Sequence, residues 1–297
     1  MSTQWEKRLG QWIKSSLCAG AMLSLASCVS VDFGEAEMFR PRPGPGLTAE
    51  AAIAAGYQFE PLDIVAQDGV HLRGGLLKKQ DASFTIIFFG GNIATAARTG
   101  LRRARELAPL NVNVVLVDYR SYGGSDVGPM SSEIFLQDGL SVFDHVVARS
   151  DINAERLVVH GHSMGSLIAG YVAANRQTAG VVLESSATTT QAYADNQVPW
   201  YGRPFVRVDV AESLRQQGNL NVIGRIDEAL MVIVGECDRD TPVSFSRQLY
   251  EASPLPSYRR RLVIVSNAGH SDVFGQPSAL DEYGQFLGSM TQAASDQ

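Results

Sequence analysis

A serine flanked by glycines has the clearest capacity for covalent chemistry in this sequence. It lies in Gly161-His162-Ser163-Met164-Gly165, between an apolar run and a stretch of helical character. The Gly-x-Ser-x-Gly spacing lets a chain turn sharply from strand to helix, because glycines lack the Cβ atoms that would collide. Ser163 is then left exposed in a strained conformation. A serine hydroxyl becomes a useful nucleophile only when a histidine takes its proton, so this turn also requires a histidine nearby.

The elements that must position Ser163 alternate between strands and helices. Asp68-Gly69 is a strong hairpin signal between two apolar stretches, residues 62–66 and 70–77. Further strands are expected at 84–89, 112–117, 157–160, 181–183, 230–234 and 262–265, and helices at 94–107, 134–147 and 163–174. This order predicts an α/β fold: a mostly parallel central sheet opened by an antiparallel hairpin, with helices on both faces.

Residues 186–227 interrupt this alternation. The segment is longer than a usual connection and carries Pro199-Trp200-Tyr201 and Pro204-Phe205. Long insertions that hold aromatic residues often serve as lids or binding walls. A surface helix with a few core aromatics is the alternative, and the sequence leaves both open.

With this order of elements, the turn at Ser163 resembles that of the α/β-hydrolase family, over roughly residues 60–290. The resemblance implies the α/β-hydrolase fold, with Ser163 as nucleophile and no metal or organic cofactor. In this family the serine is followed along the chain by an Asp or Glu and then by a His. Of the five histidines, only His270 follows Ser163, so the resemblance implies that His270 is the general base.

The acid that orients the base must be anionic and within reach of the histidine. Residues 230–242 resemble the family's strand followed by Gly-x-x-Asp and a proline, and this match places the acid at Asp238. Glu236 and Asp240 are rivals that the spacing leaves open. A solvated loop charge is the alternative interpretation of each.

The resemblance also implies two backbone donors for an oxyanion. One is the amide of Met164, which follows the nucleophile, and the other is that of Asn92 in Gly90-Gly91-Asn92. The family often carries His-Gly before the second donor, and this chain has Gly90 in place of that His. An ordinary strand-to-helix turn is the alternative for this loop.

The first 27 residues are typical of an export signal. Lys7, Arg8 and Lys14 precede a short apolar run at 17–25, which is the layout of a secretory signal peptide. The run ends in Leu25-Ala26-Ser27-Cys28, which resembles the lipobox of bacterial lipoproteins. That resemblance implies cleavage before Cys28 and its acylation. A buried N-terminal helix with an incidental cysteine is the alternative.

These signals predict the organisation of the chain. A lipoprotein signal peptide (1–27) is followed by a lipidated N-terminus and Pro/Gly-rich tether (28–56), expected to stand off the surface, and by a catalytic domain (57–292). Val29 lacks the aspartate that usually retains Gram-negative lipoproteins at the inner membrane. We therefore expect a lipid-anchored protein of the bacterial outer membrane.

The composition of the chain limits the classes of partner that it can bind. A net charge of -6 argues against nucleic acid, because phosphate binding needs a basic face. We find no Cys/His cluster with metal-ligand spacing, and we expect a monomer.

The function favoured by these features is hydrolysis of a small-molecule or lipid carboxylic ester through an acyl-enzyme on Ser163, with His270 and Asp238 completing a triad. A serine peptidase or an acyltransferase of the same fold is one alternative. A non-catalytic lipoprotein that retains the fold is another.

Overall fold

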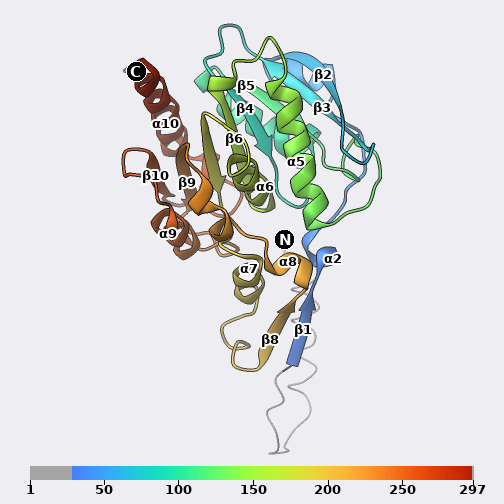
Figure 1. Cartoon of the computed structure of the whole chain (residues 1–297), viewed down its shortest axis with the longest axis vertical. Coiled ribbons are helices and arrows are strands. Elements are labelled where there is room, and N and C mark those ends of the chain that lie inside the picture. The colour runs from blue at the N-terminus through green and yellow to red at the C-terminus, as the bar shows by residue number, and fades with distance from the viewer. Residues whose placement is uncertain (1–28, 296–297) are drawn as a thin grey trace, which may run out of the picture.

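An eight-stranded sheet organises the chain, and the computed structural model describes residues 29–295 of it, with side chains to residue 291. The strand order is β10-β9-β7-β6-β4-β5-β3-β2, and β3 runs antiparallel to both of its neighbours while the other pairs are parallel. The predicted fold class, a mostly parallel sheet opened by an antiparallel hairpin, is thereby confirmed (Figure 1).

The bounds of the elements follow the predicted strands and helices closely. The strands of the large sheet are β2 (Gln58–Val65), β3 (His71–Lys78), β4 (Thr85–Phe89), β5 (Asn113–Val117), β6 (Leu157–His162), β7 (Gly180–Glu184), β9 (Ala229–Gly235) and β10 (Arg260–Val265). The helices packed around it are α3 (Ala49–Ala54), α4 (Leu101–Leu107), α5 (Ser132–Val147), α6 (Met164–Ala173), α9 (Val243–Ala252) and α10 (Pro277–Ser295). The helix expected at 94–107 begins as a single π-helical turn, Ala96–Gly100, before it continues as α4.

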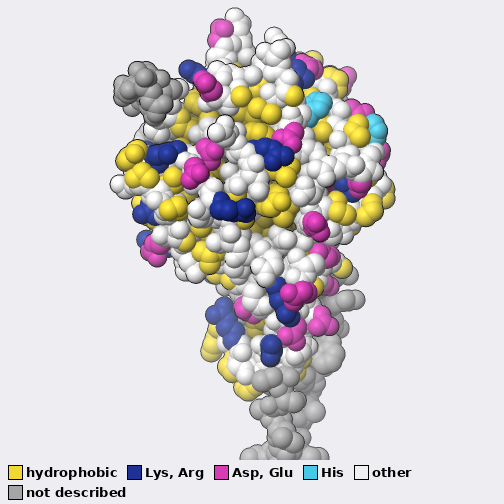
Figure 2. Space-filling model, in the orientation of Figure 1, with side chains coloured by type: hydrophobic (Ala, Val, Ile, Leu, Met, Phe, Trp, Pro, Cys, Tyr) yellow, Lys and Arg dark blue, Asp and Glu magenta, His cyan; other side chains and the backbone are white. Residues whose placement is uncertain are grey.

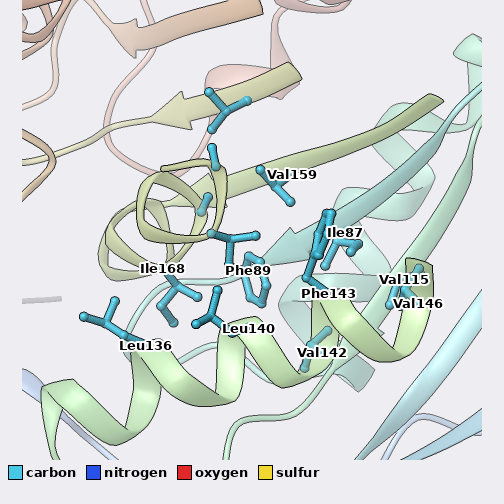
Figure 3. Close-up of a cluster of buried hydrophobic side chains, with 14 of the residues drawn as sticks. Ile87, Phe89, Val115, Leu136, Leu140, Val142, Phe143, Val146, Val159 and Ile168 are labelled. Carbon is cyan, nitrogen blue, oxygen red and sulfur yellow. The ribbon is translucent and has the colours of Figure 1, made fainter. Parts of the chain in front are cut away.

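Two apolar layers cover the faces of the sheet. Helices α5, α6 and α9 pack on one face, and α3, α4 and α10 pack on the other. Figure 3 shows Leu140 of α5 and Ile168 of α6 gathered with Ile87 and Val159 of the central strands. Because both faces are covered, the central strands are largely apolar, which explains their apolar runs in the sequence.

A second, two-stranded sheet projects from the body at one end of the molecule (Figure 1). Strand β1 (Val29–Phe33) pairs in parallel with β8 (Val206–Val210) of the insertion at 186–227. The same projection holds α7 (Thr190–Asn196) and α8 (Glu212–Arg215). Phe33 packs there in a small apolar cluster with Val198, Val208 and Leu214, so the N-terminal segment and the insertion share one core.

The N-terminal segment thus differs from the tether that the sequence predicts. After β1 and the short helix α2 (Glu35–Met38), Phe39 is buried and stacks on Phe135 of α5, with ring centroids 4.2 Å apart. The carboxylate of Glu35 accepts a hydrogen bond from the amide of Ser132 at 3.0 Å. Prolines stiffen only the stretch after Phe39. The residues before that stretch pack on the body of the protein because this buries the aromatic side chains of Phe33 and Phe39.

The predicted signal peptide at 1–27 and the acylation site at Cys28 lie outside the described residues. Within the part of the chain that the structure describes, no helix has the length and apolar character needed to cross a membrane.

Candidate active site

Ser163 occupies the sharp turn between β6 and α6. Its backbone angles are φ 55° and ψ −121°, a conformation that few non-glycine residues adopt, and its amide donates to the carbonyl oxygen of Glu184 at 2.9 Å. A Cβ atom on Gly161 would collide with the backbone of Gly165, and one on Gly165 would collide with the carbonyl of Phe89. The glycine spacing is therefore required by backbone-to-backbone contacts, as predicted.

Three side chains from separate loops meet at the carboxyl edge of the sheet. The Oγ atom of Ser163 lies 3.0 Å from Nε2 of His270, on the loop after β10. Nδ1 of His270 lies 3.0 Å from Oδ2 and 3.1 Å from Oδ1 of Asp238, on the loop after β9. Because a carboxylate only accepts, Nδ1 carries the imidazole proton, and Nε2 is left to accept the hydroxyl proton of Ser163.

Among the candidate acids, Asp238 is the one whose carboxylate contacts His270. Glu236 instead accepts a hydrogen bond from the amide of Asn267 at 3.4 Å. Asp240 contributes its backbone amide, which donates to Oδ1 of Asp238 at 3.0 Å.

Thr241 holds the Asp238 carboxylate from the other side, and the sequence interpretation missed it. Its amide donates to Oδ1 at 2.9 Å and its hydroxyl donates to Oδ2 at 2.8 Å. Side-chain carboxylates that accept local amides in this way are fixed in orientation. The position of Thr241 three residues after Asp238 could have indicated this contact, because a side chain of that type at that spacing can reach the carboxylate.

Burial and charge act in opposite directions on the His270–Asp238 pair. Burial by itself lowers the pKa of His270, but the hydrogen bond and charge of Asp238 outweigh it, so the pKa is raised above its ordinary value. Burial by itself raises the pKa of Asp238, but the hydrogen bond and charge of His270 outweigh it and the net shift is downward. The pair therefore favours an ionised carboxylate beside an imidazole that readily takes a proton.

His162, within the turn, also contacts the loop of His270. Its Nε2 atom donates to the backbone carbonyl oxygen of His270 at 2.8 Å, and Ser185 Oγ donates to the same oxygen at 3.2 Å. Burial lowers the pKa of His162 to about 4, so its imidazole is neutral at pH 7. The turn and the histidine loop are thereby joined directly.

A buried ionic cluster lies beneath this arrangement. Glu184, at the end of β7, accepts from Nη2 of Arg103 at 2.7 Å and lies 3.0 Å from Nε2 of His160. Burial by itself raises the pKa of Glu184, but the charge of Arg103 together with the contacts of His162 and His160 outweighs burial, so the pKa is lowered. The sequence interpretation overlooked this cluster. A glutamate at the end of an otherwise apolar strand could have indicated it, because a buried carboxylate needs a partner.

The two expected oxyanion donors belong to α6 and to the loop after β4. Met164 is the first residue of α6, where amides have no upstream carbonyl within the helix. A Cβ atom on Gly91 would lie 3.4 Å from Cβ of Ser163, so the loop after β4 runs directly beside the nucleophile. The side chain of Asn92 is directed away, donating to the carbonyl of Met38 at 3.3 Å.

A small apolar cavity adjoins this region. Its wall includes Met164, Ile168 and Phe135 of the main domain and Met38 and Phe39 of the N-terminal segment. Its lining contains no charged side chain. The N-terminal segment therefore helps to form the surroundings of the residue that follows Ser163.

No group of three or more His, Cys, Asp or Glu side chains within residues 29–291 has the arrangement needed to hold a metal ion.

The amino-acid sequence is similar to one protein family and to several bacterial proteins. Residues 80–222, which include Ser163, match the sequence model of the serine aminopeptidase S33 family. The uncharacterised protein Rv2307c of Mycobacterium tuberculosis is 26% identical over 246 residues, covering 82% of this chain and 81% of that protein. The uncharacterised protein YfhR of Escherichia coli K12 is 28% identical over 224 residues, covering 72% of this chain and 74% of that protein.

Solved structures resemble the whole domain. The esterase Pf2001 of Pyrococcus furiosus superposes with a TM-score of 0.65 at 20% identity, covering 83% of this chain and 96% of that one. A bacterial membrane phospholipase A superposes with a TM-score of 0.60 at 19% identity, covering 82% of this chain and 89% of that one. These likenesses and the sheet topology establish that this chain has the α/β-hydrolase fold, and together with the family match they support an activity of the hydrolase class.

Proposed function

We propose that the protein is a serine hydrolase that cleaves carboxylic esters through an acyl-enzyme on Ser163. This proposal rests on two hydrogen bonds, one between Ser163 Oγ and His270 Nε2 and one between His270 Nδ1 and Asp238. These contacts have the donor and acceptor order needed to make a serine hydroxyl nucleophilic at neutral pH.

The reaction follows from this order of contacts. Ser163 Oγ attacks the acyl carbon while its proton passes to Nε2 of His270, and the carbonyl oxygen becomes an oxyanion. The amides of Met164 and Asn92 are the proposed donors to that oxygen. Collapse of the intermediate expels the alcohol, which takes the proton from His270, and leaves the acyl group on Ser163. A water molecule then repeats the sequence and releases the acid.

An ester is preferred over a peptide because an esterase and a membrane phospholipase A are among the solved structures that share this fold. The family match to serine aminopeptidases makes peptidase activity the alternative, with acyl transfer to an alcohol a further one.

A fluorophosphonate probe tests the nucleophile directly. We expect it to label the wild-type protein, to fail on Ser163→Ala, and to label His270→Ala far more slowly. Ser257→Ala, at an exposed serine in the loop before β10, is the matched control and should be labelled normally. Equal labelling of wild type and His270→Ala would rule out the proposed general base, and a non-catalytic protein would show no labelling at Ser163.

A substrate panel distinguishes the reaction classes. We expect hydrolysis of p-nitrophenyl acyl esters well above the Ser163→Ala background, and little release from aminoacyl p-nitroanilides. Faster release from the anilides would favour a peptidase. Transfer of the acyl group to added alcohol in preference to water would favour an acyltransferase.

We also propose that the mature protein begins at an acylated Cys28 and is held at the bacterial outer membrane. This rests on the lipobox resemblance and on Val29, and it concerns residues outside the described part of the chain. Mass spectrometry of the N-terminal peptide from native membranes is expected to give a triacylated Cys28. An unmodified N-terminus elsewhere would overturn the proposal.

A further inference from the structure

The end of the projection formed by β1 and β8 carries an unusual concentration of exposed aromatic side chains. Trp200 is 79% exposed, Phe205 is 57% exposed and Tyr201 is 53% exposed. They belong to one short connection between α7 and β8, whereas most large apolar side chains of the described residues are buried. Aromatic residues gathered in one exposed place mark an interaction surface more often than isolated ones do.

The backbone holds this connection in a defined shape. The amides of Gly202 and Arg203 donate to the carbonyl of Pro199, and the amide of Phe205 donates to the carbonyl of Gly202 at 2.9 Å. The rings of Trp200 and Tyr201 meet edge to face, with centroids 5.9 Å apart. The aromatic side chains are therefore presented outward together by an ordered turn.

The chain enters the described structure at the same place. Val29 pairs with Val206 at the start of both strands, and its amide donates to the carbonyl of Phe205 at 2.8 Å. The 28 residues before Val29, which include the apolar run at 17–25 and the lipobox cysteine, therefore join the protein beside the exposed aromatics. A membrane anchor in that segment would bring this end of the projection to the lipid surface.

Basic side chains accompany the aromatics. Arg203 and Arg207 are exposed near the end of the projection, and Figure 2 shows Lys or Arg and hydrophobic side chains there. Arg207 is paired with Asp209 at 3.1 Å, and Asp32 and Asp195 are exposed on neighbouring elements. The aromatic turn itself, residues 199–205, carries Arg203 as its one charged residue. Trp and Tyr rings with a nearby arginine are the composition favoured at the boundary of lipid headgroups and acyl chains.

We propose that the aromatic turn at 199–205 is a membrane-docking surface, and that Trp200, Tyr201 and Phe205 enter the headgroup region of a phospholipid bilayer. This contact is separate from any acyl anchor, which attaches the chain but does not set its orientation. Together the two fix the projection toward the membrane, because a second point of attachment restricts rotation about the first.

Fluorescence of Trp200 tests this contact. Of the three tryptophans in the sequence, Trp5 and Trp12 lie within the proposed signal peptide, so Trp200 is the only tryptophan of a chain that begins at Cys28. Trp5→Phe and Trp12→Phe make the same true of any uncleaved chain, and they leave the turn itself unchanged. The protein is extracted in detergent and reconstituted into vesicles of phosphatidylethanolamine and phosphatidylglycerol doped with brominated phosphatidylcholine. We expect Trp200 emission to shift to shorter wavelength and to lose most of its intensity to the bromine.

A matched reporter provides the control. In the same background, Trp200→Phe with Tyr258→Trp moves the reporter to a site that is 82% exposed, before β10 at the opposite, amino edge of the sheet. Bromine quenching there should be absent. The proposal is overturned if Trp200 is not quenched, if both reporters are quenched equally, or if the protein does not float with the vesicles. Protection of Trp200 from an aqueous quencher without bromine quenching would indicate a protein partner instead, and would also overturn it.

Discussion

A hydrogen bond of 2.8 Å joins Nε2 of His162 to the backbone carbonyl oxygen of His270. It connects the residue before the proposed nucleophile to the loop of the proposed base, which lies 108 positions further along the chain. His162 is thus positioned to set the distance between Ser163 and His270.

Replacement of His162 tests this positioning role. His162→Phe keeps an aromatic ring but removes the donor, and we expect kcat for an ester to fall by up to about 100-fold, because a misplacement of about 1 Å can cost that much. KM should change little, since His162 is buried. His162→Asn, which retains an N–H donor, should recover part of the loss. An unchanged kcat in His162→Phe would contradict the role, and His145→Phe on α5 is the control.

The pH dependence of activity follows from the raised pKa of His270. The base must be neutral to accept a proton, so kcat/KM should rise with pH through a midpoint above 6.5, the ordinary value for histidine. Asp238→Asn removes the charge that raises this pKa, so the midpoint should move down while kcat falls by about 10⁴-fold, as in other serine triads. Asp281→Asn, an exposed position on α10, should alter neither quantity. A midpoint that stays in place in Asp238→Asn would show that another group is titrating.

Thr241 should contribute measurably to stability through Asp238. Thr241→Val removes the hydroxyl that donates to Oδ2, and we expect the free energy of unfolding to fall by about 1.5–3 kcal/mol, the range for hydrogen bonds to charged groups. The pKa of Asp238 is lowered in the folded state, so its ionised form stabilises the protein above its unfolded pKa. That contribution is lost as pH falls through the folded pKa. The effect of Thr241→Val should therefore be largest near neutral pH in urea unfolding. Thr241→Ser is the matched variant, and a loss as large as that of Thr241→Val would exclude the hydroxyl as the cause.

The buried pair of Arg103 and Glu184 should matter more to folding than any exposed ion pair. Their side chains are 3% and 0% exposed, so Arg103→Met leaves a carboxylate buried without its main counter-charge. We expect the free energy of unfolding to fall by about 3–5 kcal/mol in denaturant titration. Adding Glu184→Gln to Arg103→Met should recover part of this loss, because the uncompensated charge is then removed. Arg207→Met, at a side chain that is 76% exposed, should change stability by less than about 1 kcal/mol.

Much of the fold and part of the site were predictable because they depend on local patterns. The continuous apolar runs predicted the central strands, since strands covered on both faces tolerate apolar residues at every position. The glycines around Ser163 predicted the sharp turn because only residues without a Cβ atom fit against the neighbouring backbone. Asp238 and His270 were identified only through resemblance to a family, as no local pattern relates either of them to Ser163.

The sequence by itself determined the order of strands and helices, the strained serine turn and the excess of negative charge, because each is set by neighbouring residues or by composition. Only the tertiary structure decided which carboxylate faces His270, which groups hold it, and that the N-terminal segment packs on the insertion rather than standing off as a tether. The physical reason is that these contacts join segments far apart in the chain. Val29 pairs with Val206 and His162 bonds to His270, and burial and hydrogen-bond geometry select such partners only when the whole chain is folded.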